Sequence, residues 1–218
     1  QRRHQKIIEE GPWVSEEERQ DIGSKVVAGA EAIGYRGLAT FEFLRNSNGQ
    51  FYFMEVNPRV QVEHTVTEML TGVDLVSLGI IVSSGVDLPL DQDDIEIRGH
   101  AIQARINAEN PFTLEPSPGK IWECHWPGGP GIRVDTHGFS GYEMPEAFDS
   151  LLAKIISWAP DREQAIARLD SALDETILLG VDSLIPLHRA ILLEQDFAER
   201  KITTDYLETH TDLLIGGG

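Results

Sequence analysis

The dipeptide Asn48-Gly49 constrains the fold of this chain most strongly, because it separates two strand-like runs at 38–44 and 51–63. Asn-Gly favours a two-residue β-turn of type I′, in which both central residues have a positive φ. The sequence therefore predicts a β-hairpin that folds symmetrically about this dipeptide.

A symmetric register places two carboxylates opposite each other, Glu42 against Glu55, and Thr40 opposite Asn57. Directly opposed Cβ atoms lie about 4.5–5.5 Å apart, and two carboxylates about 5 Å apart repel by roughly 3 kcal/mol at an effective dielectric near 20. A hard divalent cation such as Mg²⁺ or Mn²⁺ is one reason for such a pair. The alternatives are an edge hairpin whose carboxylates point to water, and a carboxyl with a raised pKa.

Polar and apolar side chains alternate along 51–63, and successive side chains of an extended segment point to opposite faces. The odd positions therefore share one face of a strand that is expected to continue to residue 63. The polar members of that face are Glu55, Asn57, Arg59, Gln61 and Glu63. These side chains are typical of a ligand-binding set, whereas a solvated strand face usually carries mixed Lys, Thr and Ser.

The composition excludes several classes of protein. The 218 residues carry a formal net charge of −18, which argues against a nucleic-acid partner. No apolar run is long enough for a membrane span, and one cysteine excludes an intramolecular disulfide or a cysteine-based zinc site. An enzyme of the cytoplasm, or of the mitochondrial matrix in a eukaryote, is consistent with this composition. The chain lacks an initiator Met, which suggests a piece of a longer protein.

The remaining sequence predicts an α+β protein. Ser15 and Glu18 form a capping-box pattern that opens a helix ended by Gly34, and two further helices are expected on either side of Gly72. Beyond 110, short runs separated by Gly and Pro predict a β-rich lobe, followed by helices that begin near 160 and 186. We expect domains at 1–92 and 93–212, with a tail at 213–218.

A second alternating run, 99–109, places Arg105 among polar neighbours on one strand face, with Gln103 and Asn107 beside it. A guanidinium in this setting can bind an anion through two parallel hydrogen bonds. The alternative is a surface Arg–Glu pair, which contributes less than about 1 kcal/mol.

Three stretches resemble one family. Residues 53–64, FMEVNPRVQVEH, resemble the signature of the biotin carboxylase component of acyl-CoA (acetyl or propionyl) and pyruvate carboxylases, members of the ATP-grasp superfamily. ARINAE at 104–109 and QRRHQK at 1–6 are similar to family motifs as well. The resemblance implies the C-terminal half of an ATP-grasp fold with antiparallel sheet and helices, followed by a β-rich biotin carboxylase C-terminal lobe.

The resemblance also implies roles for individual residues. The implied ligands of Mg²⁺ or Mn²⁺ are Glu42, Glu55 and Asn57. The implied ATP-binding residues are Gln1, His4, Glu42 and Glu55, and the implied bicarbonate-binding residues are Lys6, Arg59, Gln61 and Val62. The implied catalytic residues are Arg59, Glu63 as general base, and Arg105, which stabilises the biotin enolate.

The implied reaction is the ATP- and bicarbonate-dependent carboxylation of biotin, through carboxyphosphate, on a carrier protein. The implied partners are a biotin carboxyl carrier domain, a carboxyltransferase component and a second copy in a homodimer. The family's upstream nucleotide-fold domain, glycine-rich lid and ATP-binding lysines have no counterpart here, so we expect the isolated chain to be inactive. The alternatives are a non-catalytic dimerisation or carrier-docking module, and another ATP-grasp ligase related to carbamoyl-phosphate synthase.

Overall fold

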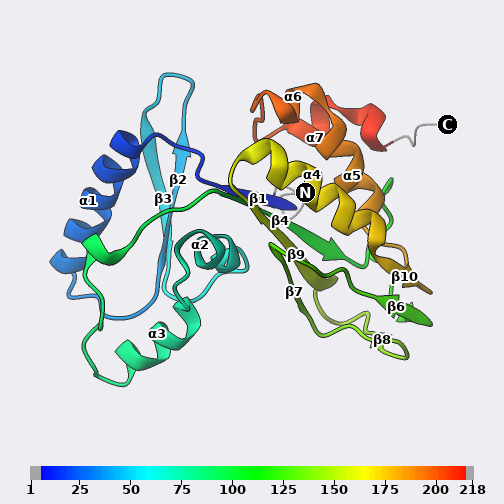
Figure 1. Cartoon of the computed structure of the whole chain (residues 1–218), viewed down its shortest axis with the longest axis horizontal. Helices are drawn as coiled ribbons and strands as arrows, with labels where there is room; N and C mark the ends of the chain where they lie inside the picture. The colour runs from blue at the N-terminus through cyan, green and yellow to red at the C-terminus, as the bar shows by residue number, and fades with distance from the viewer. Residues whose placement is uncertain (1–5, 215–218) are drawn as a thin grey trace. The chain divides into compact units, whose positions relative to one another are not determined.

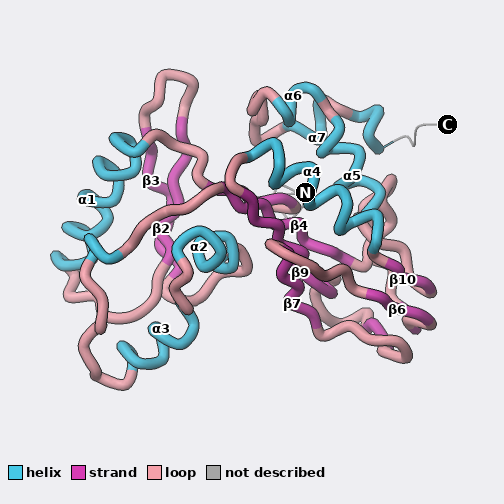
Figure 2. The backbone as a smooth tube through the Cα atoms, in the orientation of Figure 1, coloured by secondary structure: helices cyan, strands magenta, loops and turns pink. Residues whose placement is uncertain are grey.

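The computed structural model describes residues 6–214, which divide into two compact units (Figure 1, Figure 2). The hairpin unit comprises Gly11–Arg98. The sheet unit comprises the described residues up to Glu10 together with those from Gly99 onward. The chain therefore contributes a short segment to the sheet unit, builds the hairpin unit and then returns. The domain limits expected from the sequence, with a boundary at 92, stay a prediction.

The hairpin unit contains three α-helices, one β-hairpin and a 3₁₀ turn. Its elements are α1 (Glu16–Ala32), β2 (Thr40–Arg45), β3 (Phe51–Asn57), α2 (His64–Thr71), α3 (Leu75–Ser83) and η2 (Gln92–Asp94). The expected capping box is present, because the Glu18 N–H donates to Ser15 Oγ at 3.2 Å and the Ser15 N–H donates to Glu18 Oε2 at 3.0 Å. Gly72 ends α2 in the left-handed conformation, which only glycine adopts without strain.

The hairpin turn differs from the symmetric prediction. Gly49 has a φ of +80°, whereas Asn48 is not left-handed, and the Asn46 N–H donates to the Gln50 carbonyl at 3.0 Å. The loop thus has three residues, a type I turn followed by a left-handed glycine. The Asn46 side chain stabilises it by accepting from the Asn48 and Gln50 amides at 3.0 and 2.9 Å.

A β-bulge at Met54 restores the predicted pairing below this turn. Glu42 pairs with Glu55, but the next pair is Phe43 with Phe53, so Met54 has no partner. The expected Glu42–Glu55 pair is therefore present. The extra residue also shifts the strand's alternation, so Phe53 lies on the opposite face from Glu55, and the prediction that all odd positions share one face is wrong on this point.

Much of the apolar surface of the hairpin unit is exposed. Neither α1 nor α3 contains a buried residue, and Val27 of α1 and Ile80 of α3 are 53% and 67% exposed. Large apolar side chains usually gather in a core. These two helices therefore have apolar faces that nothing in the described chain covers.

The sheet unit is built on a four-stranded sheet with the order β1-β4-β9-β7, in which β9 pairs antiparallel with both β4 and β7. Its strands are β1 (Ile8–Gly11), β4 (His100–Asn107), β5 (Gly119–Lys120), β6 (Glu123–His125), β7 (Ile132–Thr136), β8 (Glu143–Met144), β9 (Leu151–Ala159) and β10 (Ile177–Leu179). Its helices are α4 (Arg162–Glu175), α5 (Ile185–Leu193), α6 (Gln195–Ala198), α7 (Tyr206–Thr209) and η3 (Thr211–Leu214).

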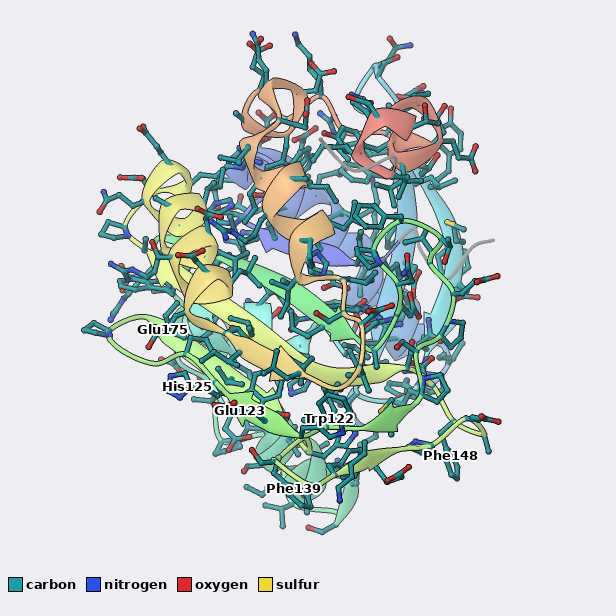
Figure 3. All side chains as sticks on the ribbon, turned by 90° about the vertical axis from the view of Figure 1, so that its right-hand side faces the viewer. Trp122, Glu123, His125, Phe139, Phe148 and Glu175 are labelled. Atoms are coloured by element: carbon teal, nitrogen blue, oxygen red, sulfur yellow. The ribbon has the colours of Figure 1, made fainter. Side chains whose placement is uncertain are left out.

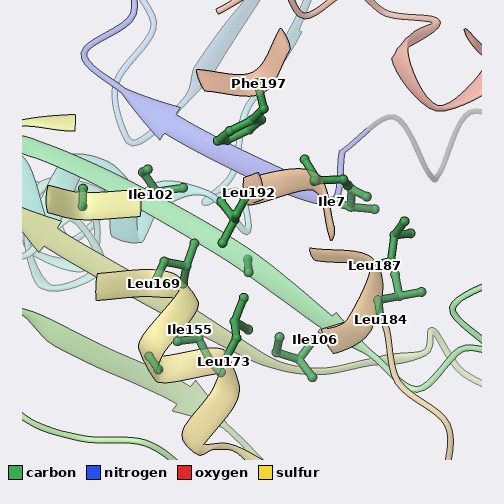
Figure 4. Close-up of a cluster of buried hydrophobic side chains, with 14 of the residues drawn as sticks. Ile7, Ile102, Ile106, Ile155, Leu169, Leu173, Leu184, Leu187, Leu192 and Phe197 are labelled. Carbon is green, nitrogen blue, oxygen red and sulfur yellow. The ribbon is translucent and has the colours of Figure 1, made fainter. Parts of the chain in front are cut away.

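Helices α4 and α5 lie over one face of this sheet and form the main core (Figure 4). The strand β4 contributes Ile102, Ala104 and Ile106, all fully buried, to this core. The alternation of 99–109 predicted this face. The opposite face of β4, which carries Arg105, is consequently free to be polar.

A buried ion cluster fastens β1 to the sheet and to α4. The Glu10 carboxylate contacts His100 Nε2 at 2.8 Å and Arg162 Nε at 2.7 Å. Arg162 also donates to the Phe197 carbonyl at 2.8 Å and stacks on the Phe197 ring. Burial raises the pKa of Glu10, but the hydrogen bonds from His100 and Arg162 outweigh it and hold the pKa below its usual range.

Three aromatic side chains of the sheet unit, Trp122, Phe139 and Phe148, are 74%, 61% and 79% exposed (Figure 3). Exposed rings of this size are uncommon on a surface that contacts only water. They make this part of the sheet unit a candidate contact surface.

Between residues 6 and 214, no single helix is long and apolar enough to cross a membrane. By length and composition only, α2 and α3 together pass the same criterion, although they are bent by 104° at the break between them.

Candidate functional site

The two carboxylates of the hairpin are bridged by amides. Asn57 Nδ2 donates to Glu42 Oε1 at 2.9 Å and to Glu55 Oε1 at 3.1 Å. Gln61 Nε2 donates to the same Glu42 oxygen at 2.7 Å. The structure thus brings together four of the residues singled out in the sequence, and we call them the carboxylate cluster: Glu42, Glu55, Asn57 and Gln61.

Gln61 is the most buried member of the carboxylate cluster, at 7% exposure. Its Oε1 atom is buried and has no hydrogen-bond partner in the described chain, and such an atom carries a desolvation cost. The Gln61 carbonyl accepts from His64 Nδ1 at 2.7 Å, so Nδ1 carries the proton. This contact fixes the turn in which Gln61 sits.

Strand β3 ends at Asn57, so the expectation that it continues to Glu63 is wrong. Pro58 has no N–H for a strand ladder, and the Arg59 N–H turns back to the Asn57 carbonyl at 2.8 Å. Arg59 is exposed and donates to the Val60 carbonyl at 3.2 Å. Val62 and Glu63 follow in the same turn, and Glu63 immediately precedes α2.

The donor set of the carboxylate cluster is suited to a hard cation. It offers two carboxylates and amide oxygens, and Mg²⁺ is typically held by one or two carboxylates together with substrate phosphates. Asn57 would have to turn its amide over to ligate through oxygen, because its nitrogen now faces both carboxylates. Among residues 6–214, no group of three or more His, Cys, Asp or Glu side chains is placed to hold a metal.

Arg105 lies in the sheet unit, on β4. Its Nε donates to Glu9 Oε1 at 2.6 Å, and the fully buried Gln103 donates to Glu9 Oε2 at 2.9 Å. The side chains of Arg105 and Glu9 are only 16% and 15% exposed. The Arg–Glu pair expected as an alternative therefore exists, but it is largely buried, and sequence reasoning did not identify Glu9 as the partner.

The backbone of Arg105 is held from two elements. Its N–H donates to the Ile7 carbonyl at 2.9 Å, and its carbonyl accepts from His188 Nε2 of α5 at 2.7 Å. The Leu184 N–H, at the start of α5, donates to the Asn107 carbonyl at 3.2 Å. The N-terminal part of α5 thus donates hydrogen bonds to the carbonyls of Arg105 and Asn107, two β4 residues that lie beyond the end of β1.

His188 is fully buried, and burial lowers its pKa from 6.5 to about 4 even though the Arg105 carbonyl acts in the opposite direction. Its ring is therefore neutral near pH 7, with the proton on Nε2. No signal in the sequence distinguishes this histidine from the others.

The remaining expected residues lie at the N-terminus. Lys6 is exposed, whereas Gln1 and His4 lie outside the described residues. Arg105 and the carboxylate cluster belong to different units, so each is considered as a separate part of the candidate site.

Two family models match the chain. Residues 1–91 match the model described as carbamoyl-phosphate synthase L chain, ATP binding domain, and residues 103–209 match the model described as biotin carboxylase C-terminal domain.

The chain is similar to curated proteins from several organisms. A biotin carboxylase from Allochromatium vinosum is 52% identical over 210 residues, which are 95% of this chain and 46% of that protein. A pyruvate carboxylase subunit from Methanothermobacter thermautotrophicus is 49% identical over 213 residues, which are 96% of this chain and 43% of that protein. The chain therefore spans about half the length of the curated relatives it matches.

Solved structures give the same result. The biotin carboxylase domain dimer of Hydrogenobacter thermophilus 2-oxoglutarate carboxylase, solved with MgADP, ADP and bicarbonate, superposes with a TM-score of 0.96 at 44% identity and covers 100% of this chain and 49% of that one. Biotin carboxylase from Campylobacter jejuni superposes with a TM-score of 0.92 at 42% identity and covers 96% of this chain and 47% of that one. The chain therefore belongs to the biotin carboxylase family, and it carries the C-terminal part of the ATP-grasp core followed by the biotin carboxylase C-terminal domain.

Proposed function

We propose that this chain is part of a biotin carboxylase that uses ATP and bicarbonate to carboxylate biotin on a carrier protein. The observation that carries the proposal is the carboxylate cluster, in which Glu42 and Glu55 face each other and share the Asn57 amide. A cation bound between the two carboxylates would offset the repulsion between them. The similarity to biotin carboxylases over almost the whole chain supports the choice of reaction.

Glu42, Glu55 and Asn57 are the residues that would hold Mg²⁺ or Mn²⁺ in this proposal, and Gln1 and His4 join the two glutamates in binding ATP. A bound divalent ion supplies charge neutralisation for the phosphates. Gln61, already fixed against Glu42 at 2.7 Å, keeps that carboxylate in position. Phosphoryl transfer depends on such positioning more than on covalent chemistry by the protein.

Arg59, Gln61, Val62 and Lys6 bind bicarbonate in this proposal. Arg59 is exposed in the turn after β3, so its guanidinium is accessible to an anion. Glu63 acts as the general base on bicarbonate. Pro58 ends the strand that carries Glu55, and the turn that follows holds Arg59, Gln61 and Val62. The proposed metal ligands and the proposed bicarbonate-binding residues of this segment can therefore contact different parts of one substrate complex.

Arg105 stabilises the negative charge that develops on the biotin ureido oxygen. Glu9 and Gln103 fix the guanidinium by direct contacts, and a preorganised donor stabilises developing charge without reorganisation cost.

Additional polypeptide completes the nucleotide site in this proposal. The exposed apolar faces of α1 and α3 support it, since Val27 and Ile80 are each more than half exposed, and the relatives are about twice as long as this chain. We further propose the domain limits 1–92 and 93–212; the matches of the two family models, at 1–91 and 103–209, support this division.

The proposed partners are a biotin carboxyl carrier domain, a carboxyltransferase component and a second copy of the protein. The exposed rings of Trp122, Phe139 and Phe148 support a protein contact on the sheet unit. The Hydrogenobacter thermophilus relative is described as a dimer. The final acceptor is an acyl-CoA or pyruvate, and the proposed location is the cytoplasm, although a relative from Arabidopsis thaliana is named as chloroplastic.

A chimeric enzyme tests the function. The matching residues of the Allochromatium vinosum biotin carboxylase are replaced by this chain, and ATP-dependent carboxylation of free biotin is measured with Mg²⁺ and bicarbonate. We expect an active chimera, and we expect Glu63→Gln in the inserted part to abolish the activity. The matched control is Glu17→Gln on the exposed surface of α1, which should leave the activity unchanged.

A folded chimera that neither hydrolyses ATP nor carboxylates biotin would contradict the proposal and favour a non-catalytic docking module. Carboxylation of ammonia in place of biotin would favour a ligase related to carbamoyl-phosphate synthase. The 218-residue chain alone should release no phosphate in response to biotin.

A further inference from the structure

The polar face of the sheet unit places two cations directly opposite each other. Arg105 on β4 and Lys154 on β9 are partners in the antiparallel ladder. The Arg105 backbone N–H and carbonyl are both bound on the other side of the strand, to Ile7 and His188. The Arg105–Lys154 pair is therefore of the non-hydrogen-bonded type, in which the Cα atoms are about 4.5 Å apart and the side chains are closest.

Each of these cations has a carboxylate on its outer side. Glu9 contacts Arg105 from the β1 side, and Asp135 of β7 contacts Lys154 Nζ at 3.3 Å. Because the strand order is β1-β4-β9-β7, the four side chains form a row across the sheet with the charges −, +, +, −. The two like charges occupy its centre, where the side chains of Arg105 and Lys154 are only 16% and 11% exposed.

Asp135 is shared with a third cation. Arg133 contacts its two carboxylate oxygens at 2.8 and 3.0 Å, both shorter than the 3.3 Å from Lys154. Partial burial raises the pKa of Asp135, but the hydrogen bonds and charges of Arg133 and Lys154 outweigh it and hold the pKa below its usual range. Asp135 is therefore shared between Arg133 and Lys154.

Like charges opposed in a partly buried strand pair destabilise a sheet, and an apolar residue at position 154 would avoid this cost. We propose that Lys154 is a second anion-binding residue of the sheet unit, and that it acts with Arg105 to bind one planar carboxylate-type anion, for which bicarbonate is the probe. This inference rests on the proposed function, because it assigns Lys154 to the same site as Arg105. Arg105 supplies a planar fork of donors and Lys154 supplies a point charge beside it.

The test is a bicarbonate titration of the isotopically labelled 218-residue chain, followed by NMR on the Lys154 Cε and Arg105 Cζ signals, with sodium chloride at equal ionic strength as reference. We expect both signals to move together and to saturate. Lys154→Met should weaken binding by about tenfold or more, the effect of removing one charged hydrogen bond, whereas Lys154→Arg should stay within about twofold of the wild type because the charge is retained. Lys120→Met, which removes an exposed lysine of the same unit, is the matched control.

Amide dispersion in the spectra establishes that each variant is folded. If Lys154→Met binds bicarbonate as tightly as the wild type while Arg105→Met does not, the role of Lys154 is wrong and the proposed function survives. If neither substitution changes binding, or if the wild type responds no more to bicarbonate than to chloride, the inference fails, whereas the proposed function, in which Arg105 acts on biotin, is tested by the chimeric enzyme.

Discussion

The imidazole of His188 donates its Nε2 proton to the Arg105 carbonyl at 2.7 Å, from a position with no solvent exposure. The His188 side chain of α5 thus supplies the hydrogen bond that a neighbouring strand would otherwise donate to the Arg105 carbonyl. Arg105 is the residue proposed to contact biotin. The protonated ring would be a buried cation, and its Nδ1 has no partner in the described chain.

We predict that the sheet unit loses stability as the pH falls from 6.5 towards 4, because His188 then gains a proton in the unfolded chain but not in the folded one. The gap between its ordinary pKa of 6.5 and the folded value of about 4 corresponds to roughly 3 kcal/mol. Urea unfolding followed on the methyl signals of Ile102 and Ile106 at pH 7.5 and 4.5 measures this.

His188→Gln, which keeps an amide donor, should remove most of this pH dependence. The exposed His125 provides the control, since His125→Gln should leave the dependence in place. An unchanged pH dependence in His188→Gln would show that the ring is not the group that titrates.

The Glu10 cluster predicts a second loss of stability in more acidic solution. Because the folded pKa of Glu10 lies below its ordinary value of 4.5, its contribution is complete above that pH and is lost as the pH falls through the folded value. Glu10→Gln should cost about 3 kcal/mol at pH 7, since Arg162 keeps a buried charge without its carboxylate. Urea unfolding at pH 7 and 3.5 checks both statements, with the exposed Glu163→Gln as control; equal stability of the two variants would contradict them.

Two glycines of the hairpin unit should respond in opposite directions to alanine. Gly49→Ala should destabilise the hairpin by about 1 kcal/mol or more, because Gly49 has a φ of +80°. Gly29→Ala in α1 should stabilise by about 1 kcal/mol, because an added Cβ there meets nothing within 4 Å. Urea unfolding followed on amide signals of the hairpin unit measures the free energy of unfolding of each variant. A stabilising Gly49→Ala would mean that the left-handed turn is not populated.

The carboxylate cluster predicts a manganese site. Mn²⁺ added to the labelled chain should broaden the amide signals around Glu42 and Glu55, and Glu42→Gln or Glu55→Gln should weaken this effect by about tenfold or more. Glu17→Gln is the matched control on an exposed helix. Equal broadening in the wild type and in Glu42→Gln would place the cation elsewhere.

Local sequence rules predicted the features that depend on near neighbours. The Ser15 capping box, the helix break at Gly72 and the buried face of β4 are all confirmed, because each depends on residues within about one or two helical turns or one strand. The family resemblance is confirmed as well by the matched models and relatives.

Contacts between distant segments were not predictable in this way. Glu9 and Arg105 are 96 residues apart, and His188 and Arg105 are 83 apart. Periodicity shows which face of a strand is polar, but it carries no information about which strand or helix becomes its neighbour. The end of β3 at Asn57 was missed for a different reason, because the alternation continues past Pro58 although the backbone does not.

The symmetric turn predicts the Glu42–Glu55 pair, and the structure has this pair for another reason. The loop is one residue longer than a two-residue turn, and the bulge at Met54 compensates for it. Two deviations that cancel thus gave a correct pairing from an incorrect turn.

Because of this compensation, the number of residues in β3 affects the proposed metal site as much as the identity of its side chains does. A deletion of the single codon for Met54 would leave every proposed metal ligand in place, yet it would remove the bulge and turn Phe53 or Glu55 to the other face. We expect such a mutant to retain the hairpin and to lose Mn²⁺ binding. Insertions and deletions in this gene should therefore be tolerated at the hairpin tip and selected against at this one position.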